Sequence, residues 1–155
     1  MRKVFAIIIL FAVISAVSGA LCEDGWVFIL CNPKTPVNVR TSPKSSSTAS
    51  GWLDFGDRVE TDGKRKNGYL HVLGVTEAGE GWVHAGYVVE DPPREVNALA
   101  YIAATGRVKA YNRIAGRRVA WLSVGAEVRV LAVSDEWAVT NRGYVKTKYL
   151  EGFYE

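Results

Sequence analysis

Past residue 32 the chain alternates between apolar and polar residues in short runs that are separated by turn residues. Residues 37–40 (Val-Asn-Val-Arg) and 57–61 (Asp-Arg-Val-Glu-Thr) show the period of two that is typical of half-buried strands. Asp62-Gly63 and Asn67-Gly68 are turn dipeptides, and further strands are expected at 69–73 and from residue 81. No window in this region carries a long helical stripe, so the pattern predicts an all-β fold.

The first twenty residues have a different pattern. Met1-Arg2-Lys3 precedes an uncharged run from Val4 to Val17, and small residues follow up to Ala20. This is the layout of a secretory signal peptide over 1–20, cleaved after Ala20. A membrane anchor is the alternative, but a span needs about 20 apolar residues. Nothing later is long or apolar enough to span, so we expect a mature protein with no membrane span, secreted or associated with the cell wall.

Two cysteines follow the predicted cleavage site. A disulfide between Cys22 and Cys31 would use both thiols in an oxidising compartment. The alternative is a lipidated Cys22, although Leu21 stands where a lipoprotein signal has a small residue. We therefore expect residues 21–34 to form a segment closed by this disulfide.

The rest of the chain repeats itself. At an offset of 69, Trp52-Leu53 falls on Trp121-Leu122, and Val39-Arg40 falls on Val108-Lys109. Further along, the offset is 62. The second copy therefore lacks seven residues, which we assign to the loop around 76–80. The repeat predicts a first domain over 35–91, a Pro-rich linker over 92–97 and a second, divergent domain over 98–153.

Three blocks of the first copy are similar to the bacterial SH3 domain and stand in the family's usual order. The blocks are Val37-Asn38-Val39-Arg40-x-x-Pro43, Gly51-Trp52-Leu53-x-x-Gly56-Asp57 and Gly81-Trp82-Val83-His84-x-x-Tyr87-Val88. The second copy keeps the Trp-Leu-x-x-Gly block and the closing Gly-aromatic-Val block, but its opening block differs. The resemblance implies two small SH3-like β-barrels in tandem after the cleaved signal peptide, each of five or six strands.

Charge narrows the choice of partners. Without Arg2 and Lys3 the chain has 17 basic and 16 acidic residues, a net charge of +1, which argues against nucleic acid as a general partner. The charges are unevenly divided: residues 98–152 hold nine basic and four acidic residues, and residues 35–91 hold six and eight. This difference would orient the protein on an anionic surface or let the two units pack together. Lys64-Arg65-Lys66 is expected to be the solvated tip of a hairpin.

The residues offer little for catalysis. The two cysteines lie near the mature N-terminus, the two histidines are His71 and His84, and no length remains for a catalytic domain. We therefore expect no enzyme activity. The spacings Cys-x-x-Cys and His-Glu-x-x-His do not occur, so we expect no metal and no cofactor. His84 is expected to be an exposed polar residue at a strand end.

Aromatic residues beside polar ones are the remaining candidates for binding, since such surfaces hold sugars and peptides. We expect Trp52 and Trp121 in the cores. For Trp82 and Tyr87, groove and core remain open, and Arg40 either lines the groove or holds its loop in place. The expected ligand-binding residues are Asn38, Arg40, Ser42, Tyr69, Trp82 and Tyr87.

The family resemblance implies peptidoglycan as the ligand, bound through its peptide stems, or another cell-wall polymer. Two linked grooves on a polymeric surface would gain from effective concentration. The competing hypothesis is a module that binds another exported protein or a host surface, which would need a continuous exposed patch across both units.

Overall fold

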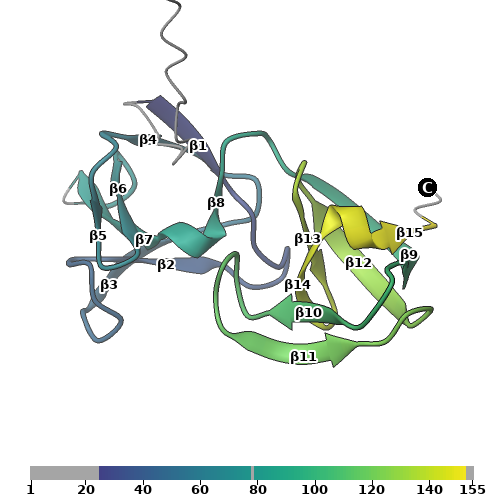
Figure 1. Ribbon diagram of the computed structural model, residues 1–155. Coiled ribbons are helices and arrows are strands. Elements are labelled where there is room, and N and C mark those ends of the chain that lie inside the picture. The colour runs from purple at the N-terminus through teal and green to yellow at the C-terminus, as the bar shows by residue number, and fades with distance from the viewer. Residues whose placement is uncertain (1–24, 78, 153–155) are drawn as a thin grey trace, which may run out of the picture.

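The computed structural model describes residues 25–77 and 79–152, which form two antiparallel sheets (Figure 1). The first sheet has the order β3-β2-β7-β6-β4-β1-β8, with β5 paired to β6. Its strands are β1 Gly25–Ile29, β2 Val37–Arg40, β3 Ala49–Leu53, β4 Arg58–Thr61, β5 Arg65–Lys66, β6 Tyr69–Leu73, β7 Glu80–His84 and β8 Val88–Val89.

The second sheet repeats this order as β11-β10-β14-β13-β12-β9-β15. Its strands are β9 Arg94–Ile102, β10 Val108–Tyr111, β11 Arg118–Leu122, β12 Glu127–Val133, β13 Trp137–Thr140, β14 Gly143–Lys146 and β15 Leu150–Glu151. In the described part of the chain, the helical elements are two three-residue 3-10 turns, η1 Ala85–Tyr87 and η2 Thr147–Tyr149. The fold is all-β, as the alternation predicts.

The sheets do not close into the barrels that the resemblance implies. Each sheet is an open path, and no ladder between the described strands joins β3 to β8 or β11 to β15. The closing strands β8 and β15 are only two residues long. Such short strands pair with β1 and β9 alone, so they leave no free length to bridge to the opposite edge.

Both sheets begin earlier than the predicted domains. β1 lies between β4 and β8, and the first sheet thus starts ten residues before residue 35. β9 starts at Arg94, inside the stretch 92–97 that was assigned to the linker. The alternation of β1 is hidden in the sequence because its outward-facing residues, Trp26 and Phe28, are apolar like the buried Val27 and Ile29.

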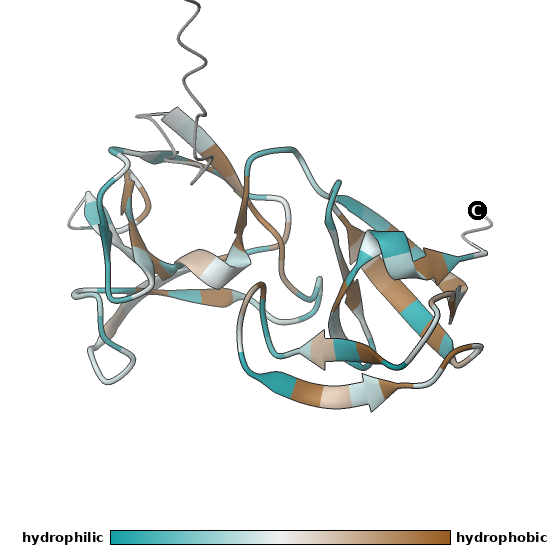
Figure 2. Ribbon diagram, in the orientation of Figure 1, coloured by the Kyte–Doolittle hydropathy of each residue, from teal (hydrophilic) through white to brown (hydrophobic). Residues whose placement is uncertain are grey.

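Each sheet encloses its own core, built from the inward positions of its strands (Figure 2). On β2, Val37 and Val39 are buried while Asn38 between them is exposed. The same period of two corrects the expectation for the two tryptophans. Since Leu53 and Leu122 point into the cores, the preceding Trp52 and Trp121 must point out, and they are 69% and 45% exposed.

The strand ladders also correct the register of the repeat at its opening block. Asn38 lies opposite Trp52, whereas the residue opposite Trp121 is Lys109. Arg40 lies opposite Trp82 and Tyr111 lies opposite Tyr144. The opening strands therefore correspond at an offset of 71, not 69. The loop of the second unit is shorter, as predicted: residues 141–142 join β13 to β14, whereas residues 74–79 join β6 to β7.

A third apolar cluster joins the two units. The first unit contributes Leu30, which is fully buried, with the partly buried Phe55, Tyr87 and Val89, and the second contributes Ala132, Trp137, Val139 and Tyr144. The Tyr144 hydroxyl donates a hydrogen bond of 2.9 Å to the Leu30 carbonyl. The Ile114 amide donates one of the same length to the Gly86 carbonyl. The two sheets are thus joined by a shared apolar cluster as well as by the segment between them.

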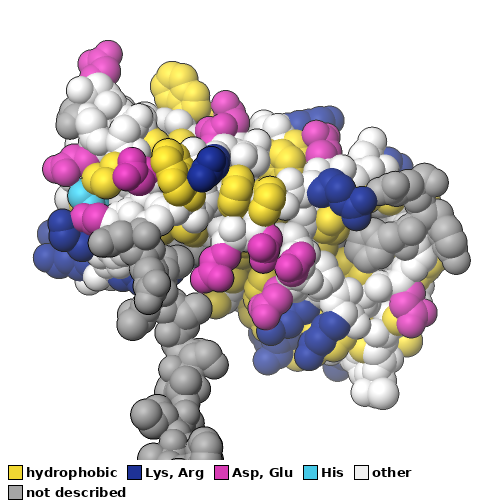
Figure 3. Space-filling model, turned by 90° about the horizontal axis from the view of Figure 1, so that it is seen from above, with side chains coloured by type: hydrophobic (Ala, Val, Ile, Leu, Met, Phe, Trp, Pro, Cys, Tyr) yellow, Lys and Arg dark blue, Asp and Glu magenta, His cyan; other side chains and the backbone are white. Residues whose placement is uncertain are grey.

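Seen from above, acidic side chains gather near the middle of the molecule (Figure 3). Glu90 and Asp91, at the end of the first sheet, line a surface hollow together with Asp135 and Glu136 of the second. The carboxylate of Asp135, across the junction, raises the pKa of Asp91. The acidic groups thus collect at the junction, apart from the basic residues of β10 and β11.

Cys31 is a free, buried thiol, and burial raises its pKa to about 11, with smaller contributions from Asp54 and Asp57. Its expected partner Cys22 lies outside the described residues, as does the signal peptide over 1–20, so the structure does not support the disulfide. No helix in the described ranges is long and apolar enough to cross a membrane.

Candidate functional site

A surface hollow of about 490 Å³ lies where the two units meet. We call it the aromatic groove. The first unit lines it with Asn38 and Arg40 of β2, Tyr69 of β6, His84 of β7 and Tyr87 of η1, and the second adds Arg113 and Tyr144. Four of the six sequence-predicted residues are therefore brought together here, and two, Ser42 and Trp82, do not line it.

Three rings form the floor of the aromatic groove. The rings of Tyr69 and His84 meet edge to face with centroids 5.0 Å apart, and Tyr87 lies 6.1 Å from His84. Tyr87 also lies 6.3 Å from Tyr144 of the second unit. Tyr69 and His84 are cross-strand partners on the outer face of β6 and β7. The register of one hairpin thus places two of the rings side by side.

His84 is held as a neutral imidazole. Its Nδ1 accepts a hydrogen bond of 3.0 Å from the Gly86 amide and so caps η1. Burial lowers the pKa of His84, and the positive charge of Arg113 lowers it further. Since Nδ1 is the acceptor, the proton of the neutral ring sits on Nε2. His84 therefore provides a donor in the groove and is not simply the exposed strand-end residue that the sequence suggests.

Arg113 reaches the groove from the loop between β10 and β11. Its side chain passes so close to Gly86 that a Cβ on that glycine would lie 2.8 Å from the Arg113 Cδ. The Arg113 Nε is buried and has no hydrogen-bond partner among the described residues. An unpaired buried donor costs about 1–3 kcal/mol, so a ligand oxygen that reaches this side chain would relieve the cost.

Arg40 and Ser42 have structural roles in the loop between β2 and β3. The Arg40 Nη1 donates a hydrogen bond of 2.6 Å to the Ser47 carbonyl, and the Ser47 hydroxyl donates to the Ser42 carbonyl at 2.8 Å. Arg40 thus holds its loop in place while also lining the groove. The loop is further fixed by Asn67, whose side-chain amide donates to the Pro43 carbonyl at 3.3 Å.

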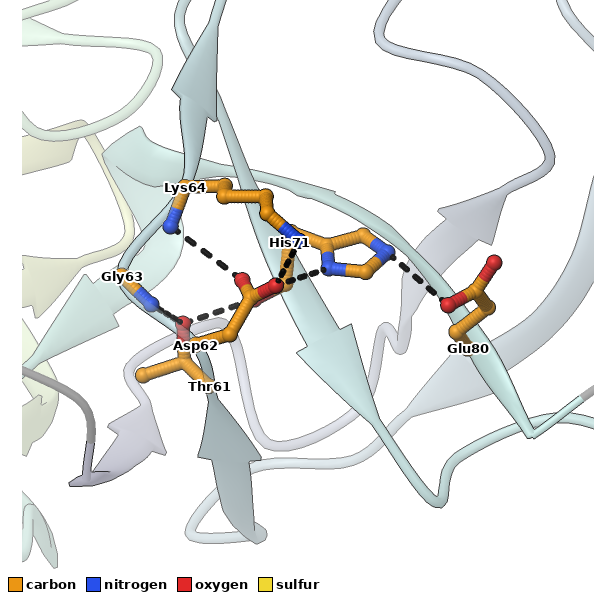
Figure 4. A network of polar contacts seen from close by, with 6 residues as sticks. All are labelled: Thr61, Asp62, Gly63, Lys64, His71 and Glu80. Carbon is orange, nitrogen blue, oxygen red and sulfur yellow. Dashed lines mark hydrogen bonds and ion pairs between the residues drawn. The ribbon is translucent and has the colours of Figure 1, made fainter.

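Trp82 is half-buried beside the groove, on the same outer face as His84. Its ring lies 4.8 Å from that of His71, its cross-strand partner. His71 is in turn fixed by a polar network (Figure 4): its Nδ1 lies 3.0 Å from Asp62 Oδ2 and its Nε2 lies 3.6 Å from Glu80 Oε2. His71 is therefore a positioning residue that supports Trp82 from one side.

The network extends to Lys64 and Thr61. Lys64 Nζ lies 2.6 Å from Asp62 Oδ2, and this hydrogen bond is the main cause that lowers the pKa of Asp62 to about 2, so the carboxylate stays charged above that pH. The Thr61 hydroxyl donates to the His71 carbonyl at 2.7 Å. In the described ranges no group of three or more His, Cys, Asp and Glu side chains is arranged to hold a metal ion.

A known protein family matches the part of the chain that contains β2, β3 and β7. Residues 35–89 match the bacterial SH3 domain. The matched segment contains all six sequence-predicted binding residues and ends before β9, so the second unit lies outside it. No curated protein sequence matches the chain.

Two solved structures are similar to the chain, NlpC1 and NlpC2 from Trichomonas vaginalis. The alignment to NlpC1 covers 95% of this chain and 51% of that one at 20% identity, with a TM-score of 0.36. The alignment to NlpC2 covers 86% and 49% at 17% identity, also with a TM-score of 0.36. The chain thus spans about half the length of each.

Sequence reasoning missed His84, Arg113 and Tyr144, which also line the groove. The sequence predicts His84 only as an exposed polar residue at a strand end. The repeat itself held a signal for Tyr144, because this residue corresponds to Trp82, which is half-buried on the outer face of β7. Tyr144 is instead 5% exposed, since that face of the second sheet packs on the first unit. No pattern in the sequence signals Arg113, which belongs to the groove only through the packing of the units.

Proposed function

We propose that the protein is an exported, non-catalytic binding protein that recognises peptidoglycan of the cell wall through its peptide stems. The ligand lies in the aromatic groove of the bacterial SH3 segment. The observation that carries the proposal is the composition of that groove: three rings for apolar and sugar surfaces, polar groups from β2, and a buried Arg113 Nε without a partner among the described residues.

The groove chemistry supports a peptide with a free carboxylate. Arg113 offers a guanidinium to an anionic group, and guanidinium–carboxylate pairs are among the stronger hydrogen-bonded contacts in proteins. His84 Nε2 and the Asn38 amide add neutral donors that suit backbone carbonyls of an extended peptide. Peptide stems of peptidoglycan carry both kinds of group.

In the described part of the second unit, the residues that correspond to Tyr69 and Trp82 do not form a second groove of this type. Trp137 and Tyr144 stand at these positions and pack in the cluster between the units, and Tyr144 is 5% exposed where Trp82 is half-buried. The second unit therefore completes the groove of the first instead of offering a copy of it. We infer that one chain binds one stem at this groove, without the gain from two linked equivalent sites.

The test is co-sedimentation of the mature protein with purified peptidoglycan sacculi at moderate salt, with three variants. Arg113→Gln is expected to weaken binding about tenfold because Arg113 lines the groove, and Trp82→Ala is expected to weaken it less because Trp82 lies beside the lining residue His84 on β7. Trp52→Ala is the matched control, because Trp52 is an exposed tryptophan of β3, a strand that contributes no residue to the groove lining. Arg113→Gln also removes an unpaired buried donor, so its stability should be equal to or above that of the parent.

Two results would count against the proposal. Protein that stays in the supernatant with several wall types makes an exported protein or a host surface the leading partner. Equal loss of binding in Trp52→Ala and Trp82→Ala would place the contact elsewhere on the first unit. Unfolding of Trp82→Ala, seen by calorimetry, would assign Trp82 to the core and leave Arg113→Gln as the deciding variant.

A further inference from the structure

The second unit has its own hollow, of about 500 Å³, at the place that corresponds to the aromatic groove. It is lined by Arg107, Lys109 and Tyr111 of the β10 region, Trp121 of β11, Lys146 of β14 and Tyr149 of η2. Lys109 corresponds to Asn38 and Lys146 to His84 in the strand ladders, and Tyr149 ends η2 as Tyr87 ends η1. The same scaffold position therefore carries different chemistry in the two units. We call this second hollow the basic hollow.

Three cations surround the exposed ring of Trp121. The charged groups of Arg118, Lys109 and Arg107 lie 4.9, 5.5 and 5.7 Å from its centroid. A cation over an exposed ring gains only about 0.5–1 kcal/mol, and three like charges around one ring repel one another. None of the three is in an ion pair within the described residues, and no carboxylate lines the hollow. The positive charge is therefore left uncompensated.

The first unit acts as an internal comparison, because it has the same strands without the cations. The positions of Arg107, Lys109 and Arg118 correspond to Pro36, Asn38 and Ala49. Trp52, the counterpart of Trp121, is exposed with no cation over its ring in the described part of the chain. The sheet forms without this cluster, so the requirements of the fold do not explain it.

We propose that the basic hollow binds an anionic saccharide or polyol polymer that carries a phosphate or carboxylate on each repeat unit. The Arg guanidinium groups pair with the oxyanions in a bidentate manner, and Trp121 offers an apolar face to the ring or chain between them. The hollow is shallow and each contact is weak, so a polymer that engages several cations at once is the fitting ligand. The net excess of five basic residues over 98–152 attracts such a chain.

This site is independent of the aromatic groove. It uses residues of β10, β11 and β14, whereas the proposed stem contacts lie on β2, β6, β7 and Arg113. Loss of one activity without the other is therefore measurable in the same preparations. If Trp82→Ala does not weaken sacculus binding, the proposal for the basic hollow is unaffected. If the basic hollow binds no polyanion, the proposal for the aromatic groove is likewise unaffected.

The experiment titrates the mature protein by calorimetry with four probes: a polyphosphate, polygalacturonate, neutral dextran and a single-stranded oligonucleotide. The site variant is Lys109→Asn/Arg118→Ala, which introduces the residues that the first unit has at these positions and should therefore fold. The control variant is Lys44→Ala/Arg142→Ala, which removes two exposed cations that neither line the hollow nor lie over the Trp121 ring. Both variants change the net charge by the same amount.

We expect both anionic polymers, or one of them, to bind and dextran not to bind. The site variant should bind at least tenfold more weakly, with the log–log salt slope reduced by about two, while the control stays within twofold of the parent. Preference for one anionic polymer identifies phosphate or carboxylate as the group recognised. Equal losses in both variants, or no binding of either polyanion, would overturn the proposal. So would tighter binding of a single-stranded oligonucleotide of the same charge, which would indicate base stacking on Trp121.

Discussion

Gly86→Ala tests the contact on which the aromatic groove depends. A Cβ at this position would lie 2.8 Å from the Ile114 carbonyl oxygen and 2.8 Å from Arg113 Cδ. The arginine can rotate away, but the carbonyl is backbone of the second unit and moves only if the units separate. The Ile114 amide would then also lose its 2.9 Å hydrogen bond to the Gly86 carbonyl.

The magnitude follows from these contacts. Overpacking costs about 1–3 kcal/mol and the lost hydrogen bond costs about 1 kcal/mol. Replacement of glycine by alanine restricts the unfolded chain and offsets about 0.4–1 kcal/mol. We expect a net loss of about 1–3 kcal/mol in the free energy of unfolding, or a decrease of about 1 M in the urea midpoint at an m-value of about 2 kcal/mol/M.

The assay is urea unfolding of the mature protein followed by tryptophan fluorescence. Gly106→Ala is the matched control, because a Cβ there meets nothing within 4 Å and its φ lies outside the left-handed region. Tyr144→Phe gives an independent measure of the same interface, with an expected loss of about 1–3 kcal/mol from the unpaired Leu30 carbonyl. If Gly86→Ala is as stable as Gly106→Ala to within 0.5 kcal/mol, a fraction of the ~1–3 kcal/mol expected from overpacking, the packing of the two units is refuted.

Two further predictions concern titratable groups. The pKa of His84 is lowered in the folded protein, so the unfolded chain binds more protons and stability should fall as the pH drops below about 6.5. His84→Asn retains an acceptor for the Gly86 amide and should reduce that fall when urea midpoints at pH 7 and pH 5 are compared. An identical pH dependence in both proteins would contradict this assignment. Cys31 is buried with a pKa of about 11, so a thiol reagent at pH 8 should label Cys31 only in urea. Peptide mass analysis tells its label from a label on Cys22. Rapid labelling of Cys31 in the native protein would show that the segment after β1 opens, and no labelling of either cysteine even in urea would point to a disulfide between them.

The sequence allowed the strands with clear alternation to be predicted. β2, β4 and β6 lie where the period of two indicates, because each has polar residues on one face and buried valines or leucines on the other. β1 escaped prediction because Trp26 and Phe28 are apolar on its outer face. The tryptophans were assigned to the cores from their type, although the buried leucine that follows each one requires the opposite direction.

The offset of 69 that the sequence predicts between β2 and β10 was wrong for a related reason. Val39-Arg40 and Val108-Lys109 look alike as letters, but Val108 pairs with Leu122 as Val37 pairs with Leu53. The second inward-facing residue of β10 is Ala110, and an alanine is too small to indicate a core position in the sequence. Without the ladders, the correspondence of Lys109 with Asn38 was out of reach, and with it the contrast between the two hollows. Contacts across the units, such as those of Arg113 and Tyr144, depend on packing that no local pattern encodes.

The apolar cluster shared by the two sheets has a consequence for anyone who divides the protein. A fragment that ends after Asp91 would expose Leu30, Phe55, Tyr87 and Val89, which the second sheet covers in the intact chain. Such a fragment would tend to self-associate during expression, and it would lack Arg113 as well. The family match ends at residue 89, but a piece that keeps these side chains covered and the groove lining complete must include the second sheet. The segment that matches the family and the segment that forms a complete core therefore have different boundaries in this chain.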